Sequence, residues 1–269
     1  MRAGPLPSAL TAAGSAEVCP VSAALMQAPP AAAVTGARRW LPRGTVYGTL
    51  LNFRREFDLW AAKMAEPPYK AAPQAPVLYV KTANTFAPSG ASIAVPGEVW
   101  VGPTLGLVIG NSESNLAPAQ AGRPQAAMDT IVFGGVSVAG CVLLDDLSLP
   151  HTSYYRPAIR FRNRDGFLAC GAQPVPAAAV DLAALHIEAW VNGALVQTVD
   201  LATLVRDAAA LLADVNAFMT LQPGDVLLLG TDCLPDGSRP LARAGDAVEL
   251  RAPGFAPLVN RLVEEGATS

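Results

Sequence analysis

Short apolar runs separated by glycine and proline dominate the chain from Thr45 onward. The first run, Thr45 to Leu51, predicts a strand, and similar runs follow at 77–80, 93–95, 105–109, 131–138, 187–191, 226–229 and 248–250. Runs of this length between turn residues are typical of strands. The pattern therefore predicts a mixed α+β fold in which β structure predominates.

Two segments instead place their apolar residues at helical spacing. From Phe53 to Met64 the apolar side chains recur every three or four residues, and two prolines then end the segment. A second apolar face extends from about Thr203 to Phe218, where Asp200 or Thr203 can cap the first turn. We expect a helix over each segment.

The first 43 residues differ in character from the rest of the chain. They consist largely of Ala, Pro, Gly, Ser and Val, and their apolar positions follow neither a strand period nor a helix period. Such composition is typical of segments without a packed core. We expect a flexible Ala/Pro-rich extension over 1–43 and one folded, catalytic-type domain over 44–265.

Charge and cysteine usage exclude several classes of function. With 19 Lys and Arg against 22 Asp and Glu, the chain offers no cationic field for a nucleic acid. No stretch approaches the roughly 20 apolar residues of a membrane span. The four cysteines lie far apart and are interpreted as reduced thiols. The expectation is a cytoplasmic protein that binds neither nucleic acid nor membrane.

Generic catalytic motifs are missing from the sequence, which has no nucleophile elbow, phosphate-binding loop or dinucleotide fingerprint. His186 lies in an apolar run and is interpreted as a strand histidine. His151 follows a proline in a polar loop, where it either lines a site or is solvated. Asp145-Asp146 is the most suggestive carboxylate pair. Because adjacent strand residues point to opposite faces, only one of the two can enter a given site.

An ordered set of stretches resembles the fumarylacetoacetate hydrolase family. Leu143 to Pro150 looks like the family's Asn-Asp-Val-Ser stretch, and Arg162 to Phe167 like its Lys-x-x-Asp-x-Phe segment. Leu221 to Thr231 is similar to its strand ending in Gly-Thr-Pro, and Arg243 to Leu250 to its Gly-Asp-x-Val-x-Leu turn. The resemblance covers about residues 44–264.

Within this family, three stretches look most like the amino-terminal half of the bifunctional isomerase/decarboxylases of 4-hydroxyphenylacetate (homoprotocatechuate) catabolism: 51–54, 69–71 and 153–159. The resemblance implies a β-roll or sandwich with peripheral helices. It also implies isomerisation or decarboxylation of a small dicarboxylic 2-oxo acid or its 2-hydroxy-diene form. The alternative is a catalytically degenerate structural partner of a metal-bearing family subunit. Either reading implies a homodimer or hetero-oligomer.

The family's metal ligands are largely replaced in this sequence. Its two glutamates, in an E-x-E pattern, correspond to Gly102 and Thr104, and only the later aspartate is retained, as Asp146. Hard divalent cations need several oxygen ligands. We therefore expect no cofactor, with Mg²⁺ or Mn²⁺ weakly held at Asp146 as the alternative.

The resemblance also assigns the remaining site residues. Glu56 takes the position of the family's general-base histidine, and Arg162 replaces its later lysine, so the expected catalytic residues are Asp146, Arg162 and Glu56. Arginine keeps a positive charge but does not readily act as a base. The expected substrate-binding residues are Lys81, Tyr154, Tyr155, Arg156 and Thr231. For Lys81, a half-exposed strand lysine is the alternative to site lining.

Overall fold

The computed structural model describes residues 39–67, 70–111, 130–152 and 159–266. Strands predominate over helices, which confirms the predicted fold class. In this part of the chain the larger sheet has nine strands: β1 (Val46–Leu50), β2 (Val77–Lys81), β3 (Phe86–Pro88), β6 (Pro103–Ile109), β7 (Ile131–Phe133), β8 (Val136–Asp146), β9 (Leu168–Cys170), β10 (Val175–Pro176) and β13 (Val226–Leu228).

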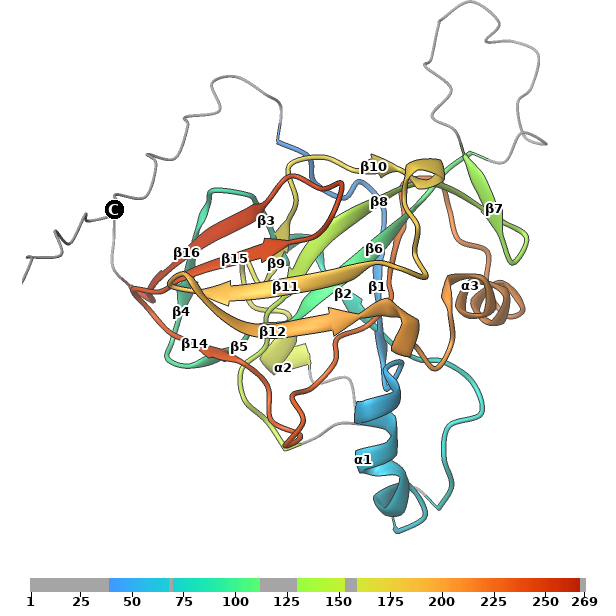
Figure 1. Cartoon of the computed structure of the whole chain (residues 1–269), viewed down its shortest axis with the longest axis horizontal. Coiled ribbons are helices and arrows are strands. Elements are labelled where there is room, and N and C mark those ends of the chain that lie inside the picture. Colours follow the sequence, from blue (N-terminus) through green and yellow to red (C-terminus); the bar gives the residue numbers. More distant parts are fainter. Residues whose placement is uncertain (1–38, 68–69, 112–129, 153–158, 267–269) are drawn as a thin grey trace, which may run out of the picture. The chain divides into compact units, whose positions relative to one another are not determined.

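A second sheet lies in front of the larger one in Figure 1. Its five strands are β4 (Ser92–Val95), β11 (His186–Val191), β12 (Ala194–Asp200), β15 (Ala247–Arg251) and β16 (Leu258–Glu264). A short two-stranded ribbon pairs β5 (Val99–Trp100) with β14 (Leu241–Ala242). The main core fills the space between the two large sheets, with Leu107 and Leu143 on one side and Ile187 and Leu250 on the other. Burial of these inward faces stabilises the sandwich.

The larger sheet is rolled. Its strand order is β2-β1-β13-β6-β8-β9-β3, with β7 and β10 pairing to β8, so β2 and β3 form opposite ends of the path. Yet only residues 82–85, which include the 3₁₀ turn η1 (Ala83–Thr85), connect these two strands in sequence. Six strand spacings in a flat sheet span roughly 29 Å, about twice the reach of so short a connection. The sheet therefore curls until β2 approaches β9 and β3.

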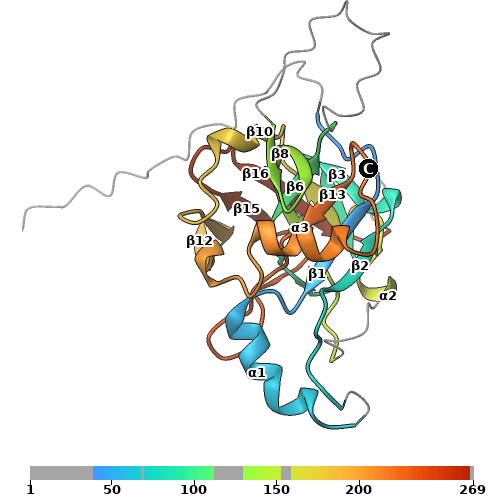
Figure 2. The ribbon, with the colours of Figure 1, turned by 90° about the vertical axis from the view of Figure 1, so that its right-hand side faces the viewer.

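The helices lie outside the sheets, as expected (Figure 2). They are α1 (Arg54–Met64), α2 (Ile159–Arg162) and α3 (Ala208–Asn216), with 3₁₀ turns η4 (Ala177–Ala179) and η5 (Leu201–Thr203). Met64 at the end of α1 packs onto Leu50, Leu51 and Tyr79 in a small separate core. The helix predicted from Phe53 to Met64 is thus confirmed.

The second predicted helix begins later than expected. Its helical part starts at Ala208, and Asp207 caps it by accepting a hydrogen bond from Ala210 N at 2.8 Å. The preceding residues are held in extended form because Asn52 binds them: Val205 N donates to Asn52 O and Arg206 N to Asn52 Oδ1. Asp200 caps the short turn η5 instead. A tertiary contact thus overrides the local helical pattern.

The run predicted as one strand over 131–138 is a hairpin. Gly134 and Gly135 have φ of 54° and 81°, the left-handed conformation that a tight two-residue hairpin turn requires. The chain therefore reverses between β7 and β8.

The described cysteines, Cys141, Cys170 and Cys233, are buried free thiols, as predicted, whereas Cys19 lies outside the described residues. The predicted extension over 1–43 falls almost entirely outside them too. None of the described helices is long and apolar enough to cross a membrane.

Candidate active site

Asp146 is a buried carboxylate at the end of β8. Its neighbour Asp145 faces different surroundings, because successive residues of a strand point to opposite sides. Asp145 Oδ1 accepts a hydrogen bond from Gly102 N at 2.7 Å. Asp146 instead faces Lys81 and Arg162. The two carboxylates thus enter separate environments, as predicted.

Three side chains surround the carboxylate of Asp146. Lys81 Nζ lies 2.9 Å from its Oδ1, and Arg162 Nη1 lies 2.7 Å from its Oδ2. The hydroxyl of Tyr79 also donates to Oδ2. The predicted site residues Asp146, Lys81 and Arg162 therefore meet in one place. Tyr79, Lys81, Asp146 and Arg162 are called the Asp146 cluster below.

Lys81 is fully buried, so the half-exposed alternative for this lysine is wrong. Its position follows from the alternation along β2, where Tyr79 and Lys81 point inward and Val80 points outward. The rolled sheet closes over the ammonium group, which also donates to the carbonyl oxygens of Arg162 and Phe167. The ammonium therefore acts as a fixed internal cation that links β2 to the segment after α2.

Burial and neighbouring charges shift the pKa values of Asp146 and Lys81 in opposite directions. Burial alone would raise the pKa of Asp146, but the charges of Lys81 and Arg162 hold it below its usual value, so the carboxylate is ionised. Burial, followed by the charge on Asp146, raises the pKa of Tyr79 well above its usual value, so the phenol keeps its proton. Burial lowers the pKa of Lys81 more than Asp146 raises it.

Asp145 differs from Asp146 because no cation contacts its carboxylate among the described residues. Burial raises the pKa of Asp145 to about 7, although the hydrogen bond from Gly102 N opposes the shift. Two adjacent aspartates therefore have pKa values displaced in opposite directions by their surroundings.

Glu56 forms a second buried ion pair, with Arg239. Arg239 Nη2 lies 2.5 Å from Glu56 Oε1, while Nη1 donates to Thr231 Oγ1 at 2.7 Å and to the carbonyl of Asp232 at 3.1 Å. Glu56 belongs to the first turn of α1. That turn is positioned by the preceding Asn52, whose side-chain amide donates to the carbonyls of Leu229 and Arg206.

One pocket of about 430 Å³ joins the two groups of charged residues. Arg162 enters it from the Asp146 cluster, and Glu56 and Arg239 line it as well. The rest of the lining is Leu50, Trp60, Lys63, Trp100, His151, Thr152, Gly237, Ser238 and Leu241. The two guanidinium groups can bind a small acidic molecule, and the carboxylate beside them can accept a proton from it.

Sequence reasoning missed Arg239, Tyr79 and Trp100. Tyr79 was detectable, because it shares a face of β2 with Lys81 two residues later. Arg239 had no motif around it, and its place depends on the fold of the loop before β14. Tyr154, Tyr155 and Arg156 lie outside the described residues.

Gly102 and Thr104 are the positions that the resemblance assigns to the family's two glutamates, and Gly102 lies in close backbone contact with Asp146. Asp146 N donates to Gly102 O at 2.8 Å, and a Cβ added at Gly102 would overlap the carbonyl oxygen of Asp146. Thr104 is buried on β6. In the described part of the chain, no three His, Cys, Asp or Glu side chains gather as metal ligands would.

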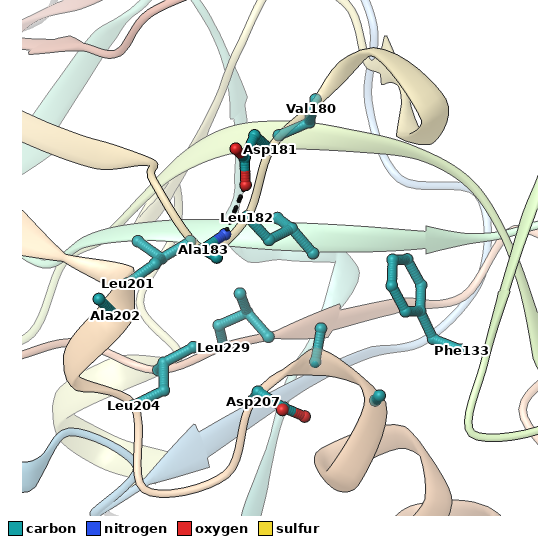
Figure 3. A pocket seen from close by; sticks show the side chains of 12 residues that line it. Phe133, Val180, Asp181, Leu182, Ala183, Leu201, Ala202, Leu204, Asp207 and Leu229 are labelled. Atoms are coloured by element: carbon teal, nitrogen blue, oxygen red, sulfur yellow. Dashed lines mark hydrogen bonds between the residues drawn. The ribbon is translucent and has the colours of Figure 1, made fainter.

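A larger pocket of about 520 Å³ lies elsewhere, beside the start of α3 (Figure 3). Most of its lining is apolar, including Leu182, Leu201 and Leu229. Asp181 and Asp207 also line it, and both carboxylates accept hydrogen bonds from nearby backbone amides. None of the described residues lining this pocket is basic, so it offers no partner for a substrate carboxylate.

Comparisons with known proteins agree with this fold. The family model "Fumarylacetoacetate (FAA) hydrolase C-terminal" matches residues 45–263. A 4-hydroxyphenylacetate degradation bifunctional isomerase/decarboxylase of Escherichia coli is 36% identical over 225 residues, which is 83% of this chain and 48% of that protein. A counterpart from Salmonella dublin is 37% identical over the same shares of the two chains. The chain thus spans about half the length of the curated relatives it matches.

Solved structures share the fold at lower identity. A 5-carboxymethyl-2-hydroxymuconate delta-isomerase from Mycobacterium smegmatis superposes with a TM-score of 0.57 at 24% identity, covering 82% of this chain and 79% of that one. The fumarylacetoacetate hydrolase of Exiguobacterium antarcticum gives a TM-score of 0.58 at 21% identity, covering 84% and 77%. The alternative of a degenerate structural partner gains no support from these comparisons. By the match over 45–263 and its identity to these relatives, the chain belongs to the fumarylacetoacetate hydrolase family.

Proposed function

We propose that this chain is an isomerase, or an isomerase subunit, that interconverts a 2-oxo-3-enedioate and its 2-hydroxy-2,4-dienedioate tautomer. One observation carries the proposal: a single pocket presents the guanidinium groups of Arg162 and Arg239 beside the carboxylate of Glu56. A doubly charged acid needs two cations, and a proton shift along a conjugated chain needs a base. Kinship to isomerase/decarboxylases supports the same reaction class.

Arg162 and Arg239 bind the substrate's carboxylate and 2-oxo ends in this proposal. Asp146 holds Arg162 in position, and in the described part of the chain the side-chain hydrogen bonds of Arg162 all use Nη1. In this proposal its other donors bind the anion. Charge that develops on the 2-oxo oxygen is stabilised by a cation already in place, without reorganisation of the site. Thr231, bonded to Arg239 Nη1, fixes the second guanidinium.

Glu56 moves the proton at the carbon end. In the direction that forms the dienol, its carboxylate removes a proton from the methylene attached to the far end of the carbon–carbon double bond. The C–H electron pair forms a new C=C bond, the existing double bond shifts, and the C=O bond becomes C–O⁻, which then takes up a proton. No atoms are lost or gained by the substrate, so decarboxylation is not required of this site.

A divalent cation does not fit the described residues. Both oxygens of Asp146 are already engaged, by Lys81 and by Arg162 and Tyr79, and two unit positive charges stand within 3 Å of the carboxylate. The space of a glutamate at Gly102 is occupied by the backbone of β8. We therefore propose that Arg162, supported by the Asp146 cluster, supplies the electrostatic stabilisation that a metal provides elsewhere.

The test is tautomerisation by the purified full chain, followed by the absorbance of the conjugated dienol. We expect acceleration above the buffer rate that persists in EDTA and that falls at least about 100-fold in Glu56→Gln. Asp58→Gln, on the same helix but outside the pocket lining, is the control. The proposal is wrong if the wild-type chain accelerates neither direction, alone or mixed with a metal-bearing family subunit.

A further inference from the structure

Helix α1 presents three of the pocket-lining side chains along one face. Glu56, Trp60 and Lys63 are four and then three residues apart, a spacing that places side chains one above the other on a helix. Glu56 is buried, Trp60 is half-buried and Lys63 is exposed. This face therefore leads from the interior of the pocket at Glu56 to its solvent-facing rim at Lys63, roughly 10 Å further along the helix axis.

The side chain of Lys63 folds back toward Glu56. Helical side chains lean toward the amino terminus of their helix. In agreement, the ammonium of Lys63 lies 4.4 Å from the centroid of the Trp60 ring, one turn nearer to Glu56. The ring face attracts the cation and restricts a side chain that is otherwise flexible. The ammonium is therefore held at the rim of the pocket, where it remains accessible to a ligand.

The charges at this pocket leave two positive charges without a countercharge among the described residues. The Asp146 cluster contains two cations and one carboxylate, so one positive charge is in excess there. Arg239 contributes no excess charge, because Glu56 balances it. Lys63 forms no ion pair with any Asp or Glu in the described part of the chain. The second excess charge thus lies at the rim.

We propose that Lys63 binds the substrate's far carboxylate, the one remote from the 2-oxo group, and thereby makes the pocket select a dicarboxylate over the matching monocarboxylate. The inference rests on the proposed isomerase function. Arg162 stabilises the 2-oxo end, and Glu56 takes the proton from the methylene that follows the double bond. The far carboxylate lies beyond this methylene, and Lys63 is the cation of the lining whose charge is still unbalanced.

Two 2-oxo acids of equal chain length isolate the far carboxylate. 2-Oxoadipate carries it, 2-oxohexanoate has a methyl group in its place, and neither contains the double bond that tautomerisation needs. Calorimetric titration of the full-length wild type should give a Kd for 2-oxoadipate at least about 10-fold lower than that for 2-oxohexanoate. In Lys63→Met the Kd for 2-oxoadipate should rise about five- to tenfold, while that for 2-oxohexanoate stays within about twofold.

Two further variants separate the charge of Lys63 from its packing on Trp60. Lys63→Arg keeps a cation, so its preference for 2-oxoadipate should stay within about threefold of wild type. Lys70→Met is the matched control at an exposed lysine outside the pocket lining, and should bind both acids as wild type does. In turnover, the loss in Lys63→Met should appear in KM, with kcat changed less than about threefold, because the contact persists unchanged through the proton transfer.

The binding and turnover measurements distinguish failure of Lys63 from failure of the isomerase function. If Lys63→Met leaves the ratio of the two Kd values unchanged, or weakens both acids equally, Lys63 does not bind the far carboxylate, whether or not the wild type turns over. If the wild type prefers 2-oxoadipate but accelerates no tautomerisation, the isomerase proposal is wrong. Loss of that preference in Lys63→Met would then still support Lys63 as the residue that selects the far carboxylate.

Discussion

Lys81 Nζ lies 2.9 Å from Asp146 Oδ1, although their strands, β2 and β8, are separated by β1, β13 and β6 in the larger sheet. The contact is possible only because the sheet rolls and brings its two ends together. It places the buried ammonium of Lys81 beside the carboxylate that the resemblance assigns to the family's metal site. The fold and the proposed metal-free chemistry therefore depend on the same contact.

Breaking this ion pair should destabilise the protein strongly. Lys81→Met leaves Asp146 with one cation in place of two, and Asp146→Asn leaves Lys81 and Arg162 facing each other without a countercharge. Each change should lower the free energy of unfolding by about 3–5 kcal/mol, measured by urea denaturation, because removal of one partner leaves a buried charge uncompensated.

The double variant should lose less than the two single losses added together, by about 1–3 kcal/mol, as expected for groups in direct contact. Lys63→Met makes the same chemical change at an exposed lysine that stacks on Trp60, and should cost less than about 1 kcal/mol. Additive losses in the double variant would show that the pair contributes no coupling.

Asp145 should make stability fall between about pH 4 and pH 7. Its folded pKa is raised to about 7, above the roughly 3.9 of an unfolded aspartate. A raised carboxyl pKa means that the folded state holds the proton more tightly. The favourable contribution is complete below the unfolded pKa and is lost as pH rises through the folded one.

Asp145→Asn removes this titration but can still accept the hydrogen bond from Gly102 N. The stability of the variant relative to wild type should therefore rise with pH between 4 and 7 and stay level above, with a total gain on the order of a few kcal/mol. Urea denaturation at several pH values measures it. A pH-independent difference between the two proteins would mean that Asp145 titrates normally in the folded state.

Gly102, which the resemblance assigns to one of the family's glutamates, should not tolerate a side chain for steric reasons. A Cβ at Gly102 overlaps the carbonyl oxygen of Asp146, so Gly102→Ala should already lower the melting temperature by about 6 °C or more, and Gly102→Glu further. Gly97→Ala is the control, since a Cβ there meets nothing within 4 Å, and its melting temperature should stay within about 2 °C of wild type. A Gly102→Glu protein that melts like wild type and is stabilised by Mn²⁺ would overturn both the steric argument and the proposal of a metal-free site.

The apolar runs predicted β1, β2, β4, β6, β11, β13 and β15, because turn residues bound each run and the roll keeps that local pattern, whereas β12 and β16 were not predicted. The helical pattern misplaced the start of α3 because Asn52, about 150 residues earlier in the chain, holds 205 and 206 in extended form. The strands β7 and β8 were predicted as one strand, because two glycines inside an apolar run do not by themselves indicate that the chain reverses its direction there.

For the site, the family motifs identified Asp146, Lys81, Arg162 and Glu56, which lie in the cluster or the pocket. They could not reveal that Lys81 is fully buried, because that depends on the closure of the rolled sheet. Arg239 escaped prediction for a similar reason: its three partners, Glu56, Thr231 and Asp232, become neighbours only after the loop before β14 folds back onto α1.

Arg239→Lys should separate charge from geometry in the pocket. Lysine keeps the positive charge but cannot span Glu56 Oε1, Thr231 Oγ1 and the Asp232 carbonyl with one planar group, so substrate should bind in a poorly fixed orientation. We expect kcat/KM for tautomerisation to fall about 10- to 100-fold. Arg55→Lys is the matched control, because Arg55 contacts the same loop through Asp232 Oδ2 and the Cys233 carbonyl but is 42% exposed and lies outside the pocket. Its kcat/KM should stay within about threefold of wild type. Equal losses in both variants would mean that the loop's stability, and not the placement of the Arg239 guanidinium, limits the reaction.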